Sequence, residues 1–593
     1  MNLTSSVARR IRFLALAMLV LVGCRPASLE LGGRAYPLFD LYTPAGSPDR
    51  YHASARGFMI ATDAPEASRA GAAMYAAGGN IVDAAVAVSF AISVVRPQST
   101  GLGGGGFLLL HLGDENQTLA FDFRERAPLA ATRDLYQDRS GNVDARSSLF
   151  GSRAVAVPGT VAGLVELHER FGSLPLDVVL EPARKLAAEG FPMYADLAGA
   201  IAQAEDDMDT GMRAVFLPDG RPPEVGEQFL QPDLALTIER IARAGRDGFY
   251  EGPVAQALLD YMAATGGLIT RADLDEYEVR SGPALVGDYN GYRIATMPPP
   301  SSGVFILNML AMLARTNPRE TYARDKAEYY HMLIEVFRRG YQDRARYGGD
   351  PLFVDVPVEH LLSNEYISGR LAAIDHRHAT PSESLDGVGA VAVESRETTH
   401  FSILDRNGNA IASTQSVNYR LGARVMIPGT GVVLNDTMDD FSAAPGVPNV
   451  YGLVGGEANA IAGGKTPLSS MSPTIVFERE NPRQVRMVLG APGGSRIITS
   501  IIETIINDIE MDMHAYASVA RARLHHQYLP DRVFFERGAM GPGVRALLEE
   551  RGHRLELVPV IGAKVFLVRR DGERLIGASD PRGDGQPLGG DLP

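Results

Sequence analysis

Cysteine is almost absent from this sequence. Cys24 is the one cysteine among 593 residues, and a lone cysteine cannot form an internal disulfide. A chain of this length can bury a large hydrophobic core, so it does not need disulfides for stability. The hydrophobic fraction of 45% and the charged fraction of 22% are typical of a globular protein. We therefore expect a globular fold that its core stabilises.

Positive charge is also in short supply. The chain has 57 Lys and Arg residues against 71 Asp and Glu residues, a formal net charge of −14. No basic stripe stands out beyond the first dozen residues. This charge balance disfavours nucleic acid as a partner.

The apolar run near the N-terminus, residues 13–22, is too short to span a bilayer comfortably and has the length of a signal-peptide core. Arg9, Arg10 and Arg12 precede it, and it ends in L-V-G-C. That ending resembles a bacterial lipobox, in which the cysteine, here Cys24, is acylated and becomes the mature N-terminus. An ordinary signal peptide followed by a chance cysteine is the alternative.

This reading predicts a signal peptide at residues 1–23 and a polar tether at residues 24–56, with the last dozen residues forming a similar tail. The expected location is the bacterial cell envelope, either periplasmic or as a lipoprotein anchored in the outer membrane. Arg25 follows the cysteine where Asp would signal retention at the inner membrane. The lipid anchor would be the only contact with a membrane.

Familiar catalytic and cofactor signatures are missing as well. The chain has no G-x-S-x-G elbow, and its cysteine is committed at the N-terminus. Residues 101–106, G-L-G-G-G-G, formally fit a dinucleotide fingerprint, but they run into an apolar strand pattern and a hairpin instead of a helix. We expect these glycines to allow close backbone packing near a site.

Histidines provide no recognisable metal site. No third acid or cysteine accompanies His376 and His378, or the pair His525 and His526, at a metal-binding spacing. We expect solvated or structural histidines, no metal and no cofactor.

What is present is a pattern of strand pairs and buried helices. Pro65 and Gly78 mark the start and the stop of one predicted helix, and residues 83–95 are apolar on every face, as in a buried helix. The predicted strands are F-L-L-L-H-L, L-A-F-D-F, T-H-F-S-I-L, V-R-M-V-L and V-F-L-V. This alternation indicates helix layers that cover antiparallel sheets.

The stretch E-S-R-E-T-T-H-F-S-I, residues 394–403, suggests a nucleophile. A threonine hydroxyl needs an adjacent base, which its own amine can provide if the threonine begins a chain. Thr398 would reach that state by attacking the carbonyl of Glu397, which gives an ester that water hydrolyses. On pattern alone, a Thr-Thr pair at a strand start is usually just two β-formers.

Long blocks of the sequence resemble the γ-glutamyltransferases, also called glutathione hydrolases, from about residue 57 to about residue 582. The resemblance implies an α+β fold of the N-terminal-nucleophile hydrolase type, an αββα sandwich. It also implies a zymogen that cuts itself into a large subunit, residues 57–397, and a small subunit, residues 398–593, which form a heterodimer. The blocks are T-T-H-F-S-I-L-D-R-N-G-N-A, L-N-D-T-M-D-D-F-S, P-G-V-P-N-V-Y-G-L-V-G-G, K-T-P-L-S-S-M-S-P-T-I-V, G-A-P-G-G-S-R-I-I-T, G-G-N-I-V-D-A-A-V-A, D-F-R-E, A-V-P-G-T-V-A-G and M-P-P-P-S-S-G.

The resemblance assigns catalytic roles by position. Thr398 matches the nucleophile for self-cleavage and catalysis, with its freed amine as general base. Gly493 and Gly494 match the pair whose N–H groups form the oxyanion hole. Ser416 stands at the position of a threonine that supports the nucleophile, and serine keeps the hydroxyl.

The resemblance also assigns a substrate head-group site. Arg124 matches the arginine that binds the substrate's α-carboxylate, assisted by Ser469 and Ser470. Asn418 and Asp440 match groups that hold the α-ammonium. Taken singly, Arg124 could be a salt-bridge partner and Asp440 a turn cap.

One departure leaves the donor preference open. Thr437 occupies a position where the family usually has Gln or Glu to help bind the α-ammonium, and Asp436 stands where Asn is usual. Threonine is too short to replace a Gln or Glu contact in the same geometry. Tyr451 matches a lid tyrosine that screens the bound substrate from water.

The expected function is γ-glutamyl acyl transfer. The enzyme would hydrolyse glutathione and other γ-glutamyl compounds, or transfer the γ-glutamyl group to amino acids and peptides. Two alternatives remain: an acylase of the same fold acting on glutaryl-type amides such as cephalosporin side chains, and an unprocessed lipoprotein that binds glutathione without turnover.

Overall fold

The computed structural model describes residues 28–42, 47–385, 397–442 and 456–592. The predicted signal peptide, Cys24 and Tyr451 lie outside the described residues. Within this part of the chain, no helix is both long enough and apolar enough to cross a membrane.

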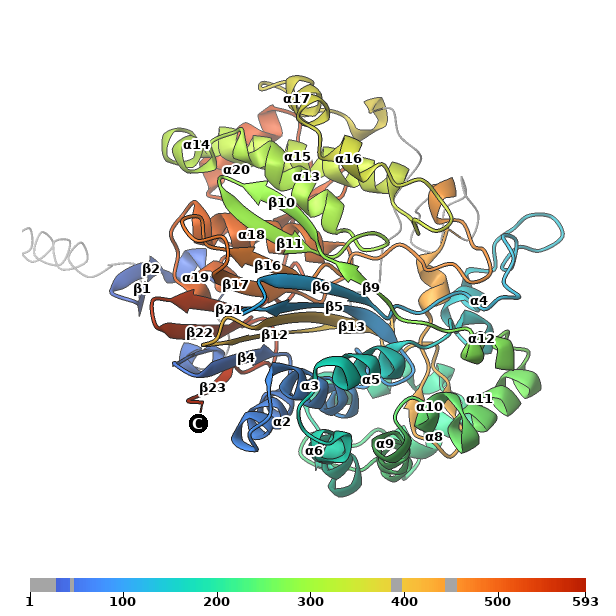
Figure 1. The fold of residues 1–593 in the computed structure, drawn as a ribbon. Coiled ribbons are helices and arrows are strands. Elements are labelled where there is room, and N and C mark those ends of the chain that lie inside the picture. Colours follow the sequence, from blue (N-terminus) through green and yellow to red (C-terminus); the bar gives the residue numbers. More distant parts are fainter. Residues whose placement is uncertain (1–27, 43–46, 386–396, 443–455, 593) are drawn as a thin grey trace, which may run out of the picture.

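Two seven-stranded sheets form the centre of the molecule (Figure 1). Every strand pair in both sheets is antiparallel. The first sheet has the order β23 (Leu588–Gly590), β4 (Phe58–Thr62), β12 (Thr399–Asp405), β13 (Ala410–Ser416), β5 (Gly105–Leu112), β6 (Gln117–Asp122) and β9 (Arg280–Pro283). The second has the order β10 (Leu285–Tyr289), β11 (Tyr292–Thr296), β16 (Thr474–Phe477), β17 (Val485–Gly490), β21 (Phe566–Asp571), β22 (Arg574–Ser579) and β3 (His52–Ala55).

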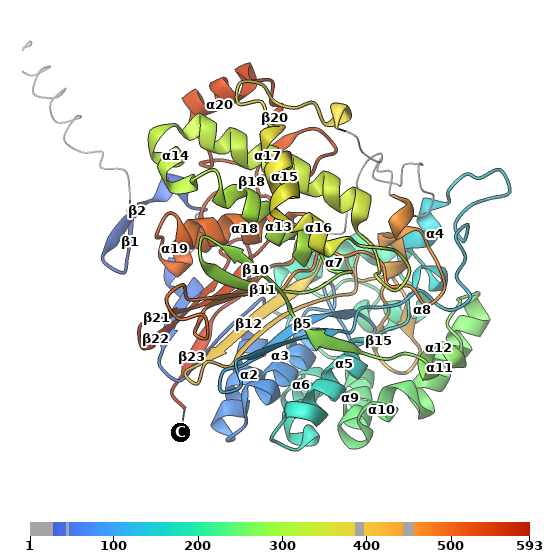
Figure 2. The same cartoon turned by 45° about the horizontal axis from the view of Figure 1, so that its top comes forward.

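A helix layer covers the outer face of each sheet (Figures 1 and 2). The core on the side of the first sheet takes residues from α2 (Pro65–Ala76), α3 (Ile81–Val95), α5 (Thr160–Phe171), α6 (Leu176–Glu189), α7 (Ala195–Ala204), α8 (Thr210–Phe216), α9 (Pro232–Ala244), α10 (Asp247–Tyr250), α11 (Gly252–Thr265) and α12 (Arg271–Asp275). The other core takes residues from α13 (Gly303–Ala314), α15 (Lys326–Tyr347), α16 (Val358–Leu361), α17 (Asn364–Ala372), α18 (Arg496–Ile509), α19 (Ala515–Ala520) and α20 (Pro542–Glu550). The predicted αββα sandwich is confirmed.

Shorter helices and strands lie outside the two main sheets and their helix layers. In the described part of the chain, the remaining α-helices are α4 (Ala145–Leu149) and α14 (Pro318–Arg324). The remaining strands are β1 (Ser28–Leu31), β2 (Arg34–Pro37), β7 (Phe191–Pro192), β8 (Gln228–Phe229), β14 (Met426–Ile427), β15 (Val432–Val433), β18 (Leu524–His525), β19 (Val533–Glu536) and β20 (Leu555–Val558).

Strand β5 shows why the first sheet is buried on both faces. Successive side chains of a strand point to opposite faces. Leu108 and Leu110 accordingly pack into the core under α2 and α3, whereas Phe107 and Leu109 pack into the core shared with the second sheet. The continuous apolar run F-L-L-L therefore serves two cores at once.

Local sequence signals located several elements correctly. Helix α2 begins at Pro65, and all fifteen residues of α3 are buried, as their apolar pattern predicts. The glycine run leads into β5, which pairs with β6 as a hairpin. A helix does not open at the glycines, so the dinucleotide fingerprint is excluded.

Both expected tails contribute strands. Part of the predicted tether, β3, pairs with β22 at the edge of the second sheet, and β1 and β2 form a separate hairpin. The C-terminal β23 pairs with β4. Edge strands are held chiefly by main-chain hydrogen bonds, which a polar, Gly-containing sequence can supply without an apolar pattern.

Candidate active site

Thr398 precedes the first residue of β12 and lies on the face of that strand that points between the two sheets. The two-residue strand period places it on the same face as His400, Ser402 and Leu404. His400 lies against β17, because a Cβ added to Gly490 would be 2.3 Å from its Cε1 atom. Thr398 itself is only 6% exposed.

Two hydroxyl groups converge on the carbonyl oxygen of Glu397. The Thr398 hydroxyl donates to it at 2.7 Å and the Ser416 hydroxyl at 2.9 Å. The two hydroxyl oxygens lie 3.4 Å apart. Because Thr399 pairs with Gln415, the register of β12 and β13 sets Thr398 opposite Ser416. This arrangement polarises the carbonyl next to the proposed nucleophile.

A close backbone approach supports Ser416 from the other side. A Cβ on Gly104 would lie 2.1 Å from the Ser416 carbonyl oxygen, so no other residue fits there without a shift. The Ser416 hydroxyl also accepts from the backbone N–H of Asn418 at 2.8 Å. The glycine run thus allows close packing at the site, as the sequence predicts.

Gly493 and Gly494 form the turn between β17 and α18. Their φ angles are 132° and 58°, in the region that favours glycine. The preceding Pro492 lines the same pocket as Thr398. Backbone N–H groups at the start of a helix favour negative charge, which suits the oxyanion role that the resemblance assigns.

Arg124 and Asp440 form a buried ion pair with each other. Arg124 follows β6, and its Nε donates to the carbonyl of Pro467 at 3.2 Å. Asp440 ends the short 3-10 helix Thr437–Asp440. The predicted anion-binding and cation-binding groups are therefore brought together.

Asn418 has a left-handed backbone, with φ of 72°, and its amide donates to the Asp436 carbonyl at 3.1 Å. Burial and the neighbouring Asp439 raise the pKa of Asp436 well above its usual range. The Thr437 hydroxyl donates to the buried carboxylate of Glu125 at 2.9 Å. At the position where the family usually has Gln or Glu, this protein thus has Thr437, which is hydrogen-bonded to Glu125.

Ser469 and Ser470 are buried two and three residues beyond the carbonyl that Arg124 contacts. The Ser469 carbonyl accepts from the Ser302 hydroxyl at 2.6 Å, and its hydroxyl accepts from the Met471 N–H at 3.1 Å. These contacts fix Ser469 in the segment that follows Pro467, whose carbonyl binds Arg124.

The sequence did not reveal the groups that hold the Glu397 side chain. Its carboxylate accepts from the Arg420 Nε at 3.1 Å and from the Ser99 hydroxyl at 3.3 Å. Arg420 is in turn paired with Asp196 on α7. Burial raises the pKa of Asp196, but the positive charges of Lys564, Arg96 and Arg420 outweigh this effect and hold that pKa below its usual range. Arg420 could have been noticed four residues after Ser416, but no sequence signal links Ser99 or Asp196 to Glu397.

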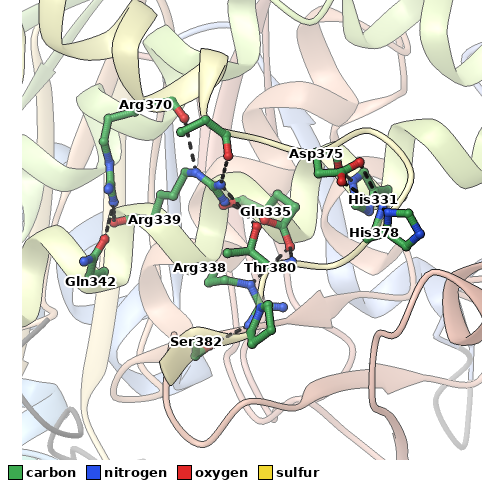
Figure 3. Close-up of polar contacts among 12 residues, drawn as sticks. His331, Glu335, Arg338, Arg339, Gln342, Arg370, Asp375, His378, Thr380 and Ser382 are labelled. Carbon is green, nitrogen blue, oxygen red and sulfur yellow. Dashed lines mark hydrogen bonds and ion pairs between the residues drawn. The ribbon is translucent and has the colours of Figure 1, made fainter. Parts of the chain in front are cut away.

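The segment that leads toward Glu397 is fixed on α15 by a polar network (Figure 3). The backbone N–H of Thr380 donates to Glu335 at 3.1 Å, and Arg338 donates to the Ser382 hydroxyl at 2.5 Å. Asp531, from the predicted small subunit, accepts from the Ser382 N–H at 2.9 Å. The network therefore joins residues 380–382 of the predicted large subunit to the predicted small subunit.

The four histidines considered as metal ligands do not form a metal site in the described part of the chain. His376 contacts Glu328 at 2.7 Å and His378 contacts Asp375 at 3.2 Å, both at the surface. His525 and His526 are buried. Within the described ranges, no group of three or more candidate ligands comes together.

Comparison with known proteins identifies the family. The family described as Gamma-glutamyltranspeptidase matches residues 67–590. This chain belongs to that family. A glutathione hydrolase proenzyme of Escherichia coli is 40% identical over 529 residues, covering 88% of this chain and 90% of the relative.

Acylases are also similar to this γ-glutamyltranspeptidase family member. The acylase ACY 1 proenzyme of a Pseudomonas species is 36% identical, covering 89% of this chain and 93% of the relative. A crystal structure of a cephalosporin acylase from Bacillus halodurans matches with a TM-score of 0.80 at 26% identity, covering 94% of this chain and 99% of that one. The family fold is therefore shared by enzymes named for two kinds of substrate.

The convergence of two hydroxyls on the Glu397 carbonyl generates a prediction. Ser416→Ala removes one donor from that oxygen, so self-cleavage should slow by about tenfold or more. The rate is measured as loss of full-length chain on a denaturing gel. Ser416→Thr, which keeps the hydroxyl, should cleave at nearly the wild-type rate. Cleavage of Ser416→Ala at the wild-type rate would show that this hydroxyl plays no part.

Proposed function

We propose that the protein is a γ-glutamyl acyl-transfer enzyme with Thr398 as its nucleophile. It hydrolyses glutathione and related γ-glutamyl compounds, or transfers the γ-glutamyl group to amino acids and peptides. Membership of the γ-glutamyltranspeptidase family and the E. coli relative named glutathione hydrolase proenzyme support this reaction.

Self-cleavage comes first. The Thr398 hydroxyl attacks the Glu397 carbonyl carbon, the C–N bond breaks, and Glu397 becomes esterified to the threonine oxygen. The released nitrogen takes the hydroxyl proton and becomes the free Thr398 amine. Water then hydrolyses the ester, which releases the Glu397 carboxylate and restores the hydroxyl, with the amine beside it as a general base. The hydrogen bond from the Thr398 hydroxyl to the Glu397 carbonyl oxygen, at 2.7 Å, supports this step because it holds the hydroxyl beside the carbonyl group that it attacks.

Turnover repeats the same chemistry on a substrate. The Thr398 hydroxyl attacks the γ-carbonyl, its proton passes through the amine to the leaving nitrogen, and a γ-glutamyl ester forms. Gly493 and Gly494 would stabilise the oxyanion, and each such donor is typically worth about a hundredfold to a thousandfold in rate. Water or an acceptor amine then releases the γ-glutamyl group.

The ion pair between Arg124 and Asp440 is the observation that carries the substrate assignment. A zwitterionic amino-acid head presents an α-carboxylate and an α-ammonium. Its carboxylate can pair with Arg124 and its ammonium with Asp440, so each residue exchanges its present partner for a substrate group of opposite charge. Hydrogen bonds connect Thr398 through Ser416 and Asn418 to Asp436. Asp436 directly precedes the 3-10 helix that ends at Asp440. A glutaryl side chain lacks the α-ammonium and would leave Asp440 without its counter-charge. Tyr451 would screen the bound head group from water.

Asp440→Asn tests this assignment against the acylase alternative. Loss of a charge-assisted contact should lower kcat/KM for a γ-glutamyl anilide by about tenfold to a hundredfold, and should lower it far less for a glutaryl anilide. Asp439→Asn is the matched control, because the Asp439 carboxylate accepts from Ser148 at 2.5 Å instead of pairing with Arg124. If the wild type prefers the glutaryl anilide and Asp440→Asn leaves the preference unchanged, the acylase assignment replaces this one.

We also propose that Cys24 is lipidated and anchors the protein in the bacterial envelope. Several buried acyl chains, at roughly 0.8 kcal/mol per methylene, hold a protein firmly on a membrane. Wild-type protein should therefore sediment with membranes, and Cys24→Ser should be released or remain unmatured. The measurement is fractionation combined with the intact mass of the N-terminal peptide. Wild-type protein that is already soluble and has no lipid mass would contradict the proposal.

A further inference from the structure

A pocket of about 490 Å³ opens beside Thr398 and is rich in charge. Its lining includes Glu397, Arg420, Lys564 and Asp196, whereas Arg124 and Asp440 do not line it. The residues proposed to hold the amino-acid head group are therefore not part of this pocket's lining. Thr398 serves both sites in the proposed reaction, because the carbonyl that reacts must lie at its hydroxyl.

Part of this pocket already holds a carboxylate. The two oxygens of Glu397 are bound by the Arg420 guanidinium and the Ser99 hydroxyl, at 3.1 and 3.3 Å. Arg420 is held by its ion pair with Asp196, and the Ser99 carbonyl accepts from the Val417 N–H at 3.3 Å. Other residues thus hold Arg420 and Ser99 in place, as a preorganised carboxylate site requires.

Glu397 cannot stay in this position during turnover. Its carbonyl oxygen lies 2.7 Å from the Thr398 hydroxyl oxygen, where the substrate carbonyl must lie. Once Glu397 leaves, four basic side chains and two acidic ones remain on the pocket lining. Of the basic ones, Arg582 is committed to Glu536 and Asp580, but Arg420 loses the carboxylate it held.

We propose that Arg420 and Ser99 bind the carboxylate of the group on the far side of the scissile bond. This proposal rests on the proposed function. With the glutamyl head bound at Arg124 and its γ-carbonyl at Thr398, the leaving group would extend into the pocket beside Thr398. The leaving dipeptide of glutathione ends in a carboxylate, as does a free amino-acid or peptide acceptor. Before cleavage, the Glu397 side chain occupies the place of that carboxylate.

Three donors test the proposal: glutathione, glutathione with its glycine carboxylate converted to the amide, and γ-glutamyl-p-nitroanilide. Wild-type enzyme should use glutathione with about tenfold higher kcat/KM than the amide, because only glutathione offers the carboxylate. Arg420→Gln should remove this preference and lower the ratio of glutathione to anilide turnover by about tenfold or more. Arg420→Lys keeps the positive charge but not the planar guanidinium with its paired N–H donors. Its ratio of glutathione to anilide turnover should lie between those of the wild type and Arg420→Gln.

Rates are expressed per mole of cleaved small subunit, because Arg420 also contacts Glu397 before cleavage. Arg243→Gln, an exposed arginine paired with Glu239 on α9, is the matched control and should change neither ratio. Equal wild-type use of glutathione and its amide would overturn the proposal even if Arg420→Gln were never cleaved. An unchanged ratio in cleaved Arg420→Gln would also overturn it. Failure of the proposed function looks different: wild-type enzyme would then turn over none of the three donors.

Discussion

The pairing of β12 with β13 is the constraint on which the site depends. It sets Thr398 opposite Ser416, so that two hydroxyls meet at one carbonyl oxygen. The same register brings the chain after β13 back over residues 98 and 99, through hydrogen bonds from Leu421 and Val417. One antiparallel pair at the centre of a buried sheet thus positions the proposed nucleophile, Ser416 and the groups that hold the Glu397 carboxylate.

Electrostatics divides the site into two parts with different partners. Arg124 and Asp440 neutralise each other, and breaking such a buried pair by removing one member typically costs about 3 to 5 kcal/mol. A zwitterionic head avoids that cost, because it gives each group a new partner. Beside Thr398, Arg420 instead shares its charge between Asp196 and the Glu397 carboxylate, which the proposed turnover would displace. The two parts therefore favour a donor with a zwitterionic amino-acid head at one end and a carboxylate at the other.

Sequence reasoning predicted what depends on local pattern and on contiguous motifs. The buried helix α3 follows from its apolar composition, and the hairpin of β5 and β6 follows from two strand patterns across a short turn. Thr398 was assigned through the resemblance of its motif to the family's nucleophile position, because on pattern alone a Thr-Thr pair at a strand start is usually two β-formers. Ser99, Asp196 and Arg420 could not be grouped from sequence, because residues far apart in the chain meet only in the folded protein. The strand β3 was missed because main-chain pairing leaves little trace in side-chain pattern.

The central claim is that the chain cuts itself at the bond between Glu397 and Thr398. The most direct measurement is the mass and N-terminal sequence of the fragments formed by precursor purified away from proteases. The account predicts a large fragment that ends at Glu397 and a small one that begins at Thr398, while Thr398→Ala stays a single inactive chain. A wild-type protein that remains uncut, as an unprocessed glutathione-binding lipoprotein would, contradicts the account, and so does normal cleavage of Thr398→Ala.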